Sequence, residues 1–364
     1  MGKSKKFMNT MTKEVYFLIP SLNKTSPING AFTLANMCTK YHKTKIIYFG
    51  RKKNKLPFHL NDRVNLLNIS FFNFLIFFFK YLFKIFDKKF RKKTIFISFT
   101  LKSDLLNSFL FFSKSISSIR GNYYLNYKLR FPLLSILLFN LHYYCLKRIN
   151  NLIVMNEKNI DKFSSDNFNI FKINNCIDEE NIFVPKLKIK NNDFFDFCYF
   201  GNFNEIKNIP FLIDKFILAI NKNKKIRLIM AGQGKLLYPM KKKIQDAKMS
   251  ENIILLGHVA DIFNLLPTMN ANINISFSEG TSRATLEALY SGIPCLLNDS
   301  EINNKLIISH KHGRIVKDLS KLEKDIELFY LEFSKFNREI TNLIPLPFRQ
   351  KTVQEEFINM INNF

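Results

Sequence analysis

The chain lacks the features that mark a disulfide-rich or metal-binding protein. It has no tryptophan, and its five cysteines are scattered over 364 residues without a CxxC pair. That spacing argues against a disulfide framework or a zinc site and fits a reducing compartment such as the cytoplasm. The basic stretch Met1–Lys13 has no apolar core, so we expect no signal peptide. No metal-ligand motif is present either, so we expect neither a metal nor a cofactor.

Acidic residues are scarce in the first half. Residues 1–150 contain 27 Lys and Arg but only four acids, a net charge of +23, whereas residues 151–364 contain 28 Lys and Arg and 25 acids, a net charge of +3. With 47% hydrophobic residues the chain can bury sizeable cores, which excludes a disordered basic chain. The uneven charge predicts an anionic partner for the first half, and nucleic acid, a membrane surface and an acidic substrate all remain open.

Long uninterrupted apolar runs are missing as well. Ile69–Phe86 is interrupted by Asn73, Lys80 and Lys84, whereas a membrane-spanning helix needs ~20 apolar residues with few charges. The two lysines share one helix face. This fits a core helix of an α/β domain or an amphipathic helix whose edge touches a membrane. A second stretch, Phe131–Ile149, carries charges only near its end and predicts another buried helix.

Short β-rich runs alternate with helical lengths, which predicts parallel sheets joined by right-handed crossovers. A loop containing Pro27 and Gly30 should follow the first strand, and the last helical stretch should break near Pro345–Pro347. We expect two doubly wound Rossmann-like α/β domains, 1–175 and 190–345, with a C-terminal helix at 346–364 packing back towards the first. A cleft between the domains is the expected site, because ligands of such sheets bind beyond the carboxyl ends of the strands. The expected strands are 14–20, 45–49, 64–69, 94–99, 116–119, 152–155, 195–200, 227–231, 253–256, 272–275 and 294–297.

Glycine is rare, so its positions are informative. Seven of the 11 glycines lie between residues 201 and 313, and Gly201, Gly232 and Gly257 directly follow predicted strands. A ligand can approach the backbone closely at such positions, although ordinary tight turns have the same pattern. The GQG at 232–234 is not a GxGxxG fingerprint, which disfavours a nicotinamide dehydrogenase.

The segment SEGTSRATLEALYSGIP, residues 278–294, carries the clearest chemical signal. A strand enters a loop with Glu279 and Gly280, and Thr281 or Ser282 can cap the helix that follows. Free N–H groups at such a helix start favour an anion, most obviously a diphosphate. Glu279 and Glu287 flank that point, and a carboxylate can accept hydrogen bonds from two neighbouring sugar hydroxyls. Glu287 alone would equally suit an exposed helix surface.

The spacing of the two glutamates, followed by Gly292-Ile293-Pro294, resembles the signature of retaining GT-B glycosyltransferases of family GT4. Three further segments resemble the family's motifs in the same order: FCYFGNFNEIKNIPFLIDKF at 197–216, LIMAGQGKLLYPMKKKI at 228–244 and NIILLGHVADIFNLL at 252–266. INNCIDEENI at 173–182 resembles its interdomain segment. LIPSLNKTSPINGAFTLANMC at 18–38 is similar to its first glycine loop, and 97–122 to enzymes that build surface polysaccharides.

The resemblance implies a GT-B fold and a role for each matching donor-site residue. Glu279 would contact the hydroxyls of the donor sugar and Glu287 the ribose. Lys207 would pair with the diphosphate, and backbone near His258 and Val259 would meet the base. The diphosphate and sugar ring would lie on Gly280, Thr281, Ser282 and Arg283, beside the turns at Gly201 and Gly232.

Two positions depart from the family pattern. Asn202 replaces the arginine that usually follows the first glycine, so one cation is missing, and we expect Arg283 to supply it because a guanidinium suits phosphate. Asn29-Gly30 replaces the usual Gly-Gly of the first-domain loop, which is expected to approach the acceptor or a phosphate. Arg120 is a candidate for an acceptor phosphate, or else an ordinary surface arginine.

These features predict a glycosyltransferase that needs no metal and has no carboxylate placed for double displacement. Transfer would be front-face, with the leaving diphosphate stabilised by Lys207, Arg283 and the helix start. The expected partners are a nucleotide-sugar donor, a polyprenyl-diphosphate-linked or lipopolysaccharide-type acceptor and the anionic inner face of the cytoplasmic membrane. Phenylalanines at core-like spacing disfavour nucleic acid. A GT-B epimerase or phosphorylase, an inactive scaffold and a non-enzymatic basic binding protein are the alternatives.

Overall fold

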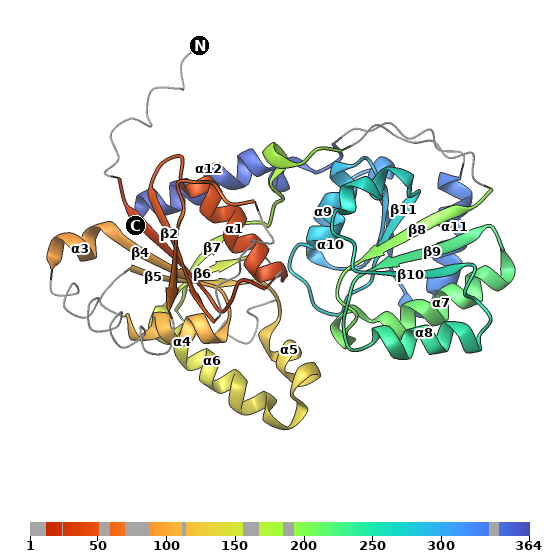
Figure 1. Ribbon diagram of the computed structural model, residues 1–364, viewed down its shortest axis with the longest axis horizontal. Helices are drawn as coiled ribbons and strands as arrows, with labels where there is room; N and C mark the ends of the chain where they lie inside the picture. The colour runs from red at the N-terminus through yellow and green to blue at the C-terminus, as the bar shows by residue number, and fades with distance from the viewer. Residues whose placement is uncertain are drawn as a thin grey trace, which may run out of the picture. The chain divides into compact units, whose positions relative to one another are not determined.

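The protein forms two units, each a parallel sheet covered by helices (Figure 1). The computed structural model describes residues 12–23, 25–50, 59–69, 87–110, 114–155, 167–184, 193–334 and 342–364. The first unit comprises Met1–Lys128, Leu133–Asp178 and Gln350–Phe364, and the second comprises Leu129–Pro132 and Glu179–Arg349. The expected class, two Rossmann-like α/β domains, is confirmed.

The first unit is built on a seven-stranded sheet in the order β3-β2-β1-β4-β5-β6-β7, with every pair parallel. Its strand order reverses between β1 and β4, where ligands of such sheets bind. The strands are β1 Glu14–Ile19, β2 Lys43–Phe49, β3 Asn65–Ile69, β4 Thr94–Ser98, β5 Lys114–Ile119, β6 Asn151–Val154 and β7 Asn169–Lys172. The helices are α1 Ser26–Cys38, α3 Lys88–Lys93, α4 Leu101–Phe109, α5 Tyr123–Arg130, α6 Ser135–Ile149 and α12 Gln350–Asn363.

Both faces of this sheet are buried, which explains its continuous apolar strands. Phe17 of β1 packs on one face with α1 and α12, and its ring centroid lies 6.3 Å from that of Phe357. Tyr16 points to the other face and stacks on Phe96. Lys13 fixes the end of α12, because its ammonium donates to the carbonyls of Ile361 (2.6 Å) and Asn362 (2.9 Å). The helix α12 thus completes the core of the first unit.

The second unit has a six-stranded parallel sheet in the order β10-β9-β8-β11-β12-β13. Its order reverses at β8, which lies between β9 and β11. The strands are β8 Phe195–Phe200, β9 Ile226–Ala231, β10 Ile253–Gly257, β11 Ala271–Asn274, β12 Cys295–Asn298 and β13 Gly313–Val316. The helices are α7 Ile209–Lys222, α8 Leu237–Asp246, α9 Arg283–Tyr290, α10 Glu301–Leu306 and α11 Leu322–Phe333. Phe197 of β8 joins α7 to α11 through ring contacts with Phe216 and Phe329.

Three local expectations need correction. Pro27 and Gly30 lie inside α1 rather than in a loop, since a proline is tolerated in the first helical turn. The strands β7 and β13, both at sheet edges, were not expected. The stretch Phe131–Ile149 is not a fully buried helix, because α6 exposes one apolar face. The helix packs against α4, β5 and β6, and its buried residues include His142, Cys145 and Leu146.

The segment Ile69–Phe86 lies outside the described residues except for Ile69, which ends β3. Within the described part of the chain, no helix combines the length and apolar character required to cross a bilayer.

Candidate active site

The residues expected to bind the donor gather at one edge of the second sheet. Gly201 and Asn202 follow β8, Gly232 follows β9, and His258 and Val259 follow β10. The segment from Glu279 to Glu287 lies between β11 and β12 and includes most of α9. Because the strands are parallel, all of these positions lie beyond the carboxyl ends of the strands, where doubly wound sheets bind ligands.

The turns after β8, β9 and β10 pack backbone on backbone. Gly232 has φ +154°, and a Cβ there would lie 1.8 Å from the carbonyl oxygen of Gly201. Its N–H donates to the carbonyl of Gly257 at 2.7 Å, and the N–H of Gly201 donates to the carbonyl of Ala231 at 3.0 Å. A side chain at Gly232 would therefore separate these turns. The Tyr199 hydroxyl supports the first turn by donating to the Asn202 carbonyl at 3.1 Å.

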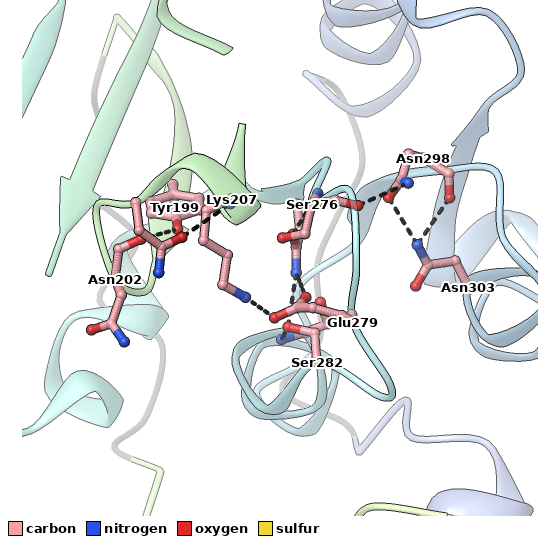
Figure 2. A network of polar contacts seen from close by, with 11 residues as sticks. Tyr199, Asn202, Lys207, Ser276, Glu279, Ser282, Asn298 and Asn303 are labelled. Atoms are coloured by element: carbon pink, nitrogen blue, oxygen red, sulfur yellow. Dashed lines mark hydrogen bonds and ion pairs between the residues drawn. The ribbon is translucent and has the colours of Figure 1, made fainter. Parts of the chain in front are cut away.

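A short 3₁₀ turn, Glu205–Lys207, presents Lys207 to the loop after β11. Asn204 caps this turn by accepting from the Lys207 N–H at 3.2 Å. The loop after β11 is held beside it, because the Phe277 N–H donates to the Ile206 carbonyl at 2.9 Å. The Lys207 ammonium consequently forms an ion pair with Glu279 (Figure 2). The structure thus brings together two residues that lie 72 positions apart in the sequence.

Burial and the neighbouring Glu279 carboxylate have opposite effects on the charge of Lys207. Removal from water lowers the pKa of Lys207 to about 7, because burial disfavours the ammonium. The Glu279 carboxylate opposes that shift, and both side chains keep a solvent-accessible edge, 18% for Lys207 and 23% for Glu279. A diphosphate beside Lys207 would favour its charged form in the same way as the carboxylate does.

Asn274, at the end of β11, organises the loop that carries Glu279. Its amide donates to the second Glu279 oxygen at 2.7 Å and to the Ser282 hydroxyl at 2.8 Å. Its carbonyl oxygen accepts from the Ser276 hydroxyl at 2.6 Å. Lys207 holds one oxygen of the Glu279 carboxylate and Asn274 holds the other, so the carboxylate has a fixed orientation.

The helix α9 begins beside this carboxylate. Of the two candidates Thr281 and Ser282, the cap is Ser282, whose hydroxyl accepts from the Thr285 N–H at 3.4 Å. Arg283 in the first turn pairs with Glu287, with 2.9 Å between Nε and Oε1. The arginine expected to bind phosphate and the glutamate expected to bind ribose therefore hold each other in place.

The sequence reasoning missed three members of this network: Asn274, Ser276 and Asn298. Asn298 donates to the Ser276 carbonyl at 3.2 Å and is itself held by the amide of Asn303. A signal was present, because β11 is buried along its whole length yet contains asparagine at two alternate positions, 272 and 274. Buried polar side chains need hydrogen-bond partners, so their presence in a core strand indicates a polar network at its end.

In the first unit, the structure brings Gly30 and Arg120 together. A Cβ at Gly30 would lie 2.8 Å from an Arg120 guanidinium nitrogen. Arg120 follows β5, donates to the Ser118 hydroxyl (3.0 Å) and to the Asn175 side-chain oxygen (3.1 Å), and lies over the Phe99 ring. Asn29, in the same turn of α1 as Gly30, keeps its side-chain oxygen buried.

The Arg120 guanidinium is an unusual cation. Burial lowers the pKa of Arg120 to about 10, and its hydrogen bonds to described residues go to neutral oxygens. Arg120 is thus partly buried and held by hydrogen bonds to Ser118 and Asn175. A partly buried guanidinium whose partners among the described residues are neutral is suited to an anionic ligand such as phosphate. Across the residues that the structure describes, no group of three His, Cys, Asp or Glu side chains could hold a metal ion.

The comparisons with known proteins agree with this site. Residues 180–337 match the family model described as glycosyl transferases group 1. The matched segment contains all of the residues expected to bind the donor.

Two curated relatives match shorter segments. A UDP-Gal:alpha-D-GlcNAc-diphosphoundecaprenol alpha-1,3-galactosyltransferase from Escherichia coli is 29% identical over 104 residues, 28% of this chain and 27% of the relative. An alpha-monoglucosyldiacylglycerol synthase from Streptococcus pneumoniae is 28% identical over 111 residues, 30% of this chain and 25% of the relative. The chain thus matches about a quarter of the length of each relative.

Solved structures extend the similarity of the fold to the whole chain. Anabaena HepE in complex with UDP-glucose aligns with a TM-score of 0.73 at 14% identity, covering 96% of this chain and all of that one. A variant of S. aureus TarM aligns with a TM-score of 0.70 at 12% identity, covering 96% of this chain and 97% of that one. The fold of these neighbours is the GT-B fold.

Proposed function

We propose that the protein is a retaining glycosyltransferase that transfers a sugar from a nucleotide-sugar donor to a lipid-linked or oligosaccharide acceptor in bacterial surface polysaccharide synthesis. The observation that carries the proposal is the arrangement of Glu279, Lys207, Arg283 and Glu287 around the start of α9. It combines two carboxylates for hydroxyl groups with two cations and a helix N-terminus for a diphosphate. The family match covers this segment.

The geometry suggests how the donor would bind. Glu279 and Glu287 already have cationic partners, so the diphosphate would take Lys207 and Arg283 over from them. The two carboxylates would then accept hydrogen bonds from the sugar and the ribose. The two cations would then be paired with the diphosphate and the two carboxylates hydrogen-bonded to hydroxyls, so no charged group would be left without a partner.

The proposed reaction is a front-face transfer. The bond between the anomeric carbon and the diphosphate oxygen breaks, and the acceptor hydroxyl forms the new bond on the same face and gives its proton to the departing diphosphate. Lys207, Arg283 and the N–H groups at the start of α9 would stabilise the negative charge on that leaving group. The proposal requires no divalent ion.

The proposed acceptor site lies around Arg120, Asn29 and Gly30 in the first unit. A partly buried guanidinium suits the phosphate of a polyprenyl-diphosphate-linked or lipopolysaccharide-type acceptor. The names of the two relatives support a lipid-linked acceptor, since one acts on a diphosphoundecaprenol-linked sugar and the other makes a glycosylated diacylglycerol. We further propose that the protein is cytoplasmic, works at the inner face of the cytoplasmic membrane and does not bind nucleic acid.

The experiment measures nucleotide release from UDP-, GDP- and dTDP-sugars, with and without a polyprenyl-diphosphate-linked sugar as acceptor. We expect release that requires the acceptor and a product that keeps the donor's anomeric configuration by NMR. Conversion of the donor without acceptor would instead show an epimerase, and an inverted product would refute retention. Glu279→Gln should lose activity, whereas Asn252→Ala, which removes two amide hydrogen bonds far along the same sheet, should keep it.

A further inference from the structure

The helix α6 and the turn before it expose an apolar surface. Leu133 is fully exposed, and Ile136 and Leu137 are each 66% exposed. Leu134, Leu141 and Tyr144 are also exposed. We name these six residues the α6 face. Isolated exposed apolar residues are common, but a contiguous set of this size indicates an interaction surface.

The opposite side of α6 is firmly anchored. His142 is buried and its Nε2 lies 2.7 Å from the Asp104 carboxylate of α4, while its Nδ1 lies 2.8 Å from the Tyr127 hydroxyl of α5. The Ser98 hydroxyl donates to the other Asp104 oxygen at 2.6 Å. These contacts fix the orientation of α6 about its own axis. The α6 face therefore points to solvent and is not part of the core of this unit.

The charge around the α6 face has one sign. Residues 123–150 contain Lys128, Arg130, Lys147 and Arg148 and no acid. At the end of α6, Lys147 lies over the ring of Tyr143 and Arg148 over the ring of Tyr144. From Arg148 back towards Leu133 the side chains are basic, then aromatic, then apolar, which is the order of layers met on entering an anionic bilayer from water. A second copy of this chain would bring basic surfaces together, which costs energy.

We propose that the α6 face docks on an anionic lipid bilayer, with its leucines and isoleucine among the acyl chains and Lys147 and Arg148 at the headgroups. The proposal rests on the proposed function in one respect, since a lipid-linked acceptor would be presented at that same surface. It goes further by naming the residues that make the contact. It also places the contact on α6, outside the segment 70–86.

The experiment is co-sedimentation of the full chain with vesicles of phosphatidylcholine, with and without phosphatidylglycerol. The test variant combines Leu133→Ser, Ile136→Ser and Leu137→Ser. The matched control combines Ile308→Ser, Leu331→Ser and Leu346→Ser, three exposed apolar residues of the second unit. We expect the test variant to lose about 100-fold in vesicle partitioning and the control to bind like the wild type. Removing two charges with Lys147→Gln and Arg148→Gln should weaken binding by roughly tenfold or more at low salt only.

Four outcomes would overturn the proposal. The test variant could bind vesicles as the wild type does, or wild-type binding could be independent of phosphatidylglycerol. The wild type could fail to bind any vesicle. The test variant could instead turn a dimer into a monomer by light scattering, which would identify a second copy as the occupant. Acceptor-dependent nucleotide release with a detergent-solubilised acceptor is measured separately, so loss of docking and loss of the proposed activity are distinguishable.

Discussion

Asn274→Ala is the sharpest test of how the donor-site loop is organised. The change removes the amide that donates to Glu279 at 2.7 Å and to Ser282 at 2.8 Å, while the Lys207 contact to Glu279 remains. A hydrogen bond to a charged group contributes about 1.5–3 kcal/mol. We therefore expect the binding energy that depends on an oriented Glu279 to fall by about 2 kcal/mol, a factor of roughly 30.

The assay is calorimetric titration with two ligands: the free nucleoside diphosphate and the sugar nucleotide identified by the release screen. Only the sugar is expected to contact Glu279, so Asn274→Ala should reduce the extra affinity that the sugar provides. Affinity for the free diphosphate should change by less than about fivefold, because Ser282 still caps α9. Asn252→Ala serves as the control for loss of an asparagine amide in the same unit. Equal losses for both ligands would refute the positioning role, and so would no loss for either.

Three further predictions concern charged groups. The pKa of Lys207 is lowered to about 7, so its positive charge is lost as the pH rises through that value. We expect kcat/KM for the donor to fall over the same pH range. Lys207→Arg should remove this pH dependence from steady-state profiles. Arg283→Ala should weaken donor binding by about tenfold by calorimetry, and unchanged affinity would refute its contact with phosphate. Asp104→Ala leaves His142 and Ser98 without their buried partner and should lower the free energy of unfolding by about 3–5 kcal/mol in urea titrations, whereas a change below about 1 kcal/mol would contradict the network.

Much of the fold could be predicted because strand and helix periods are local properties of the sequence. The buried strands β1, β4 and β8 were found from apolar runs alone. The strands β7 and β13 escaped because each is a four-residue edge strand, and β7 carries Asn169 and Lys172 at its ends with no buried residue. Edge strands bury little, so their sequences resemble loops.

The donor site was predictable in part. Glu279 and Glu287 stand in a loop and helix whose spacing resembles a family signature, and Lys207 was placed by the same resemblance. Their pairing was not foreseen, because an ion pair between residues 207 and 279 depends on tertiary packing. The sequence places Asn274 in a strand but does not show that its amide donates to Glu279 and Ser282 at the strand's end.

The buried face of α6 could not be predicted from the sequence. Composition alone does not distinguish an apolar face that packs on a sheet from one that meets solvent or lipid. The helix has apolar residues on both sides, so Phe131–Ile149 read as buried throughout. Only the anchoring of His142 by Asp104 decides which side points inward.

The return of α12 to the first unit has a consequence for synthesis on the ribosome. Strand β1 begins at Glu14, but the helix that covers its face near Phe17 starts at Gln350. Synthesis proceeds from the N-terminus at about 5–20 residues per second. One face of the first sheet, covered by α1 alone on that side near Phe17, therefore lacks α12 until the whole second unit has been made. During that interval the apolar surface around Phe17, which α12 later covers, is available for a chaperone to bind.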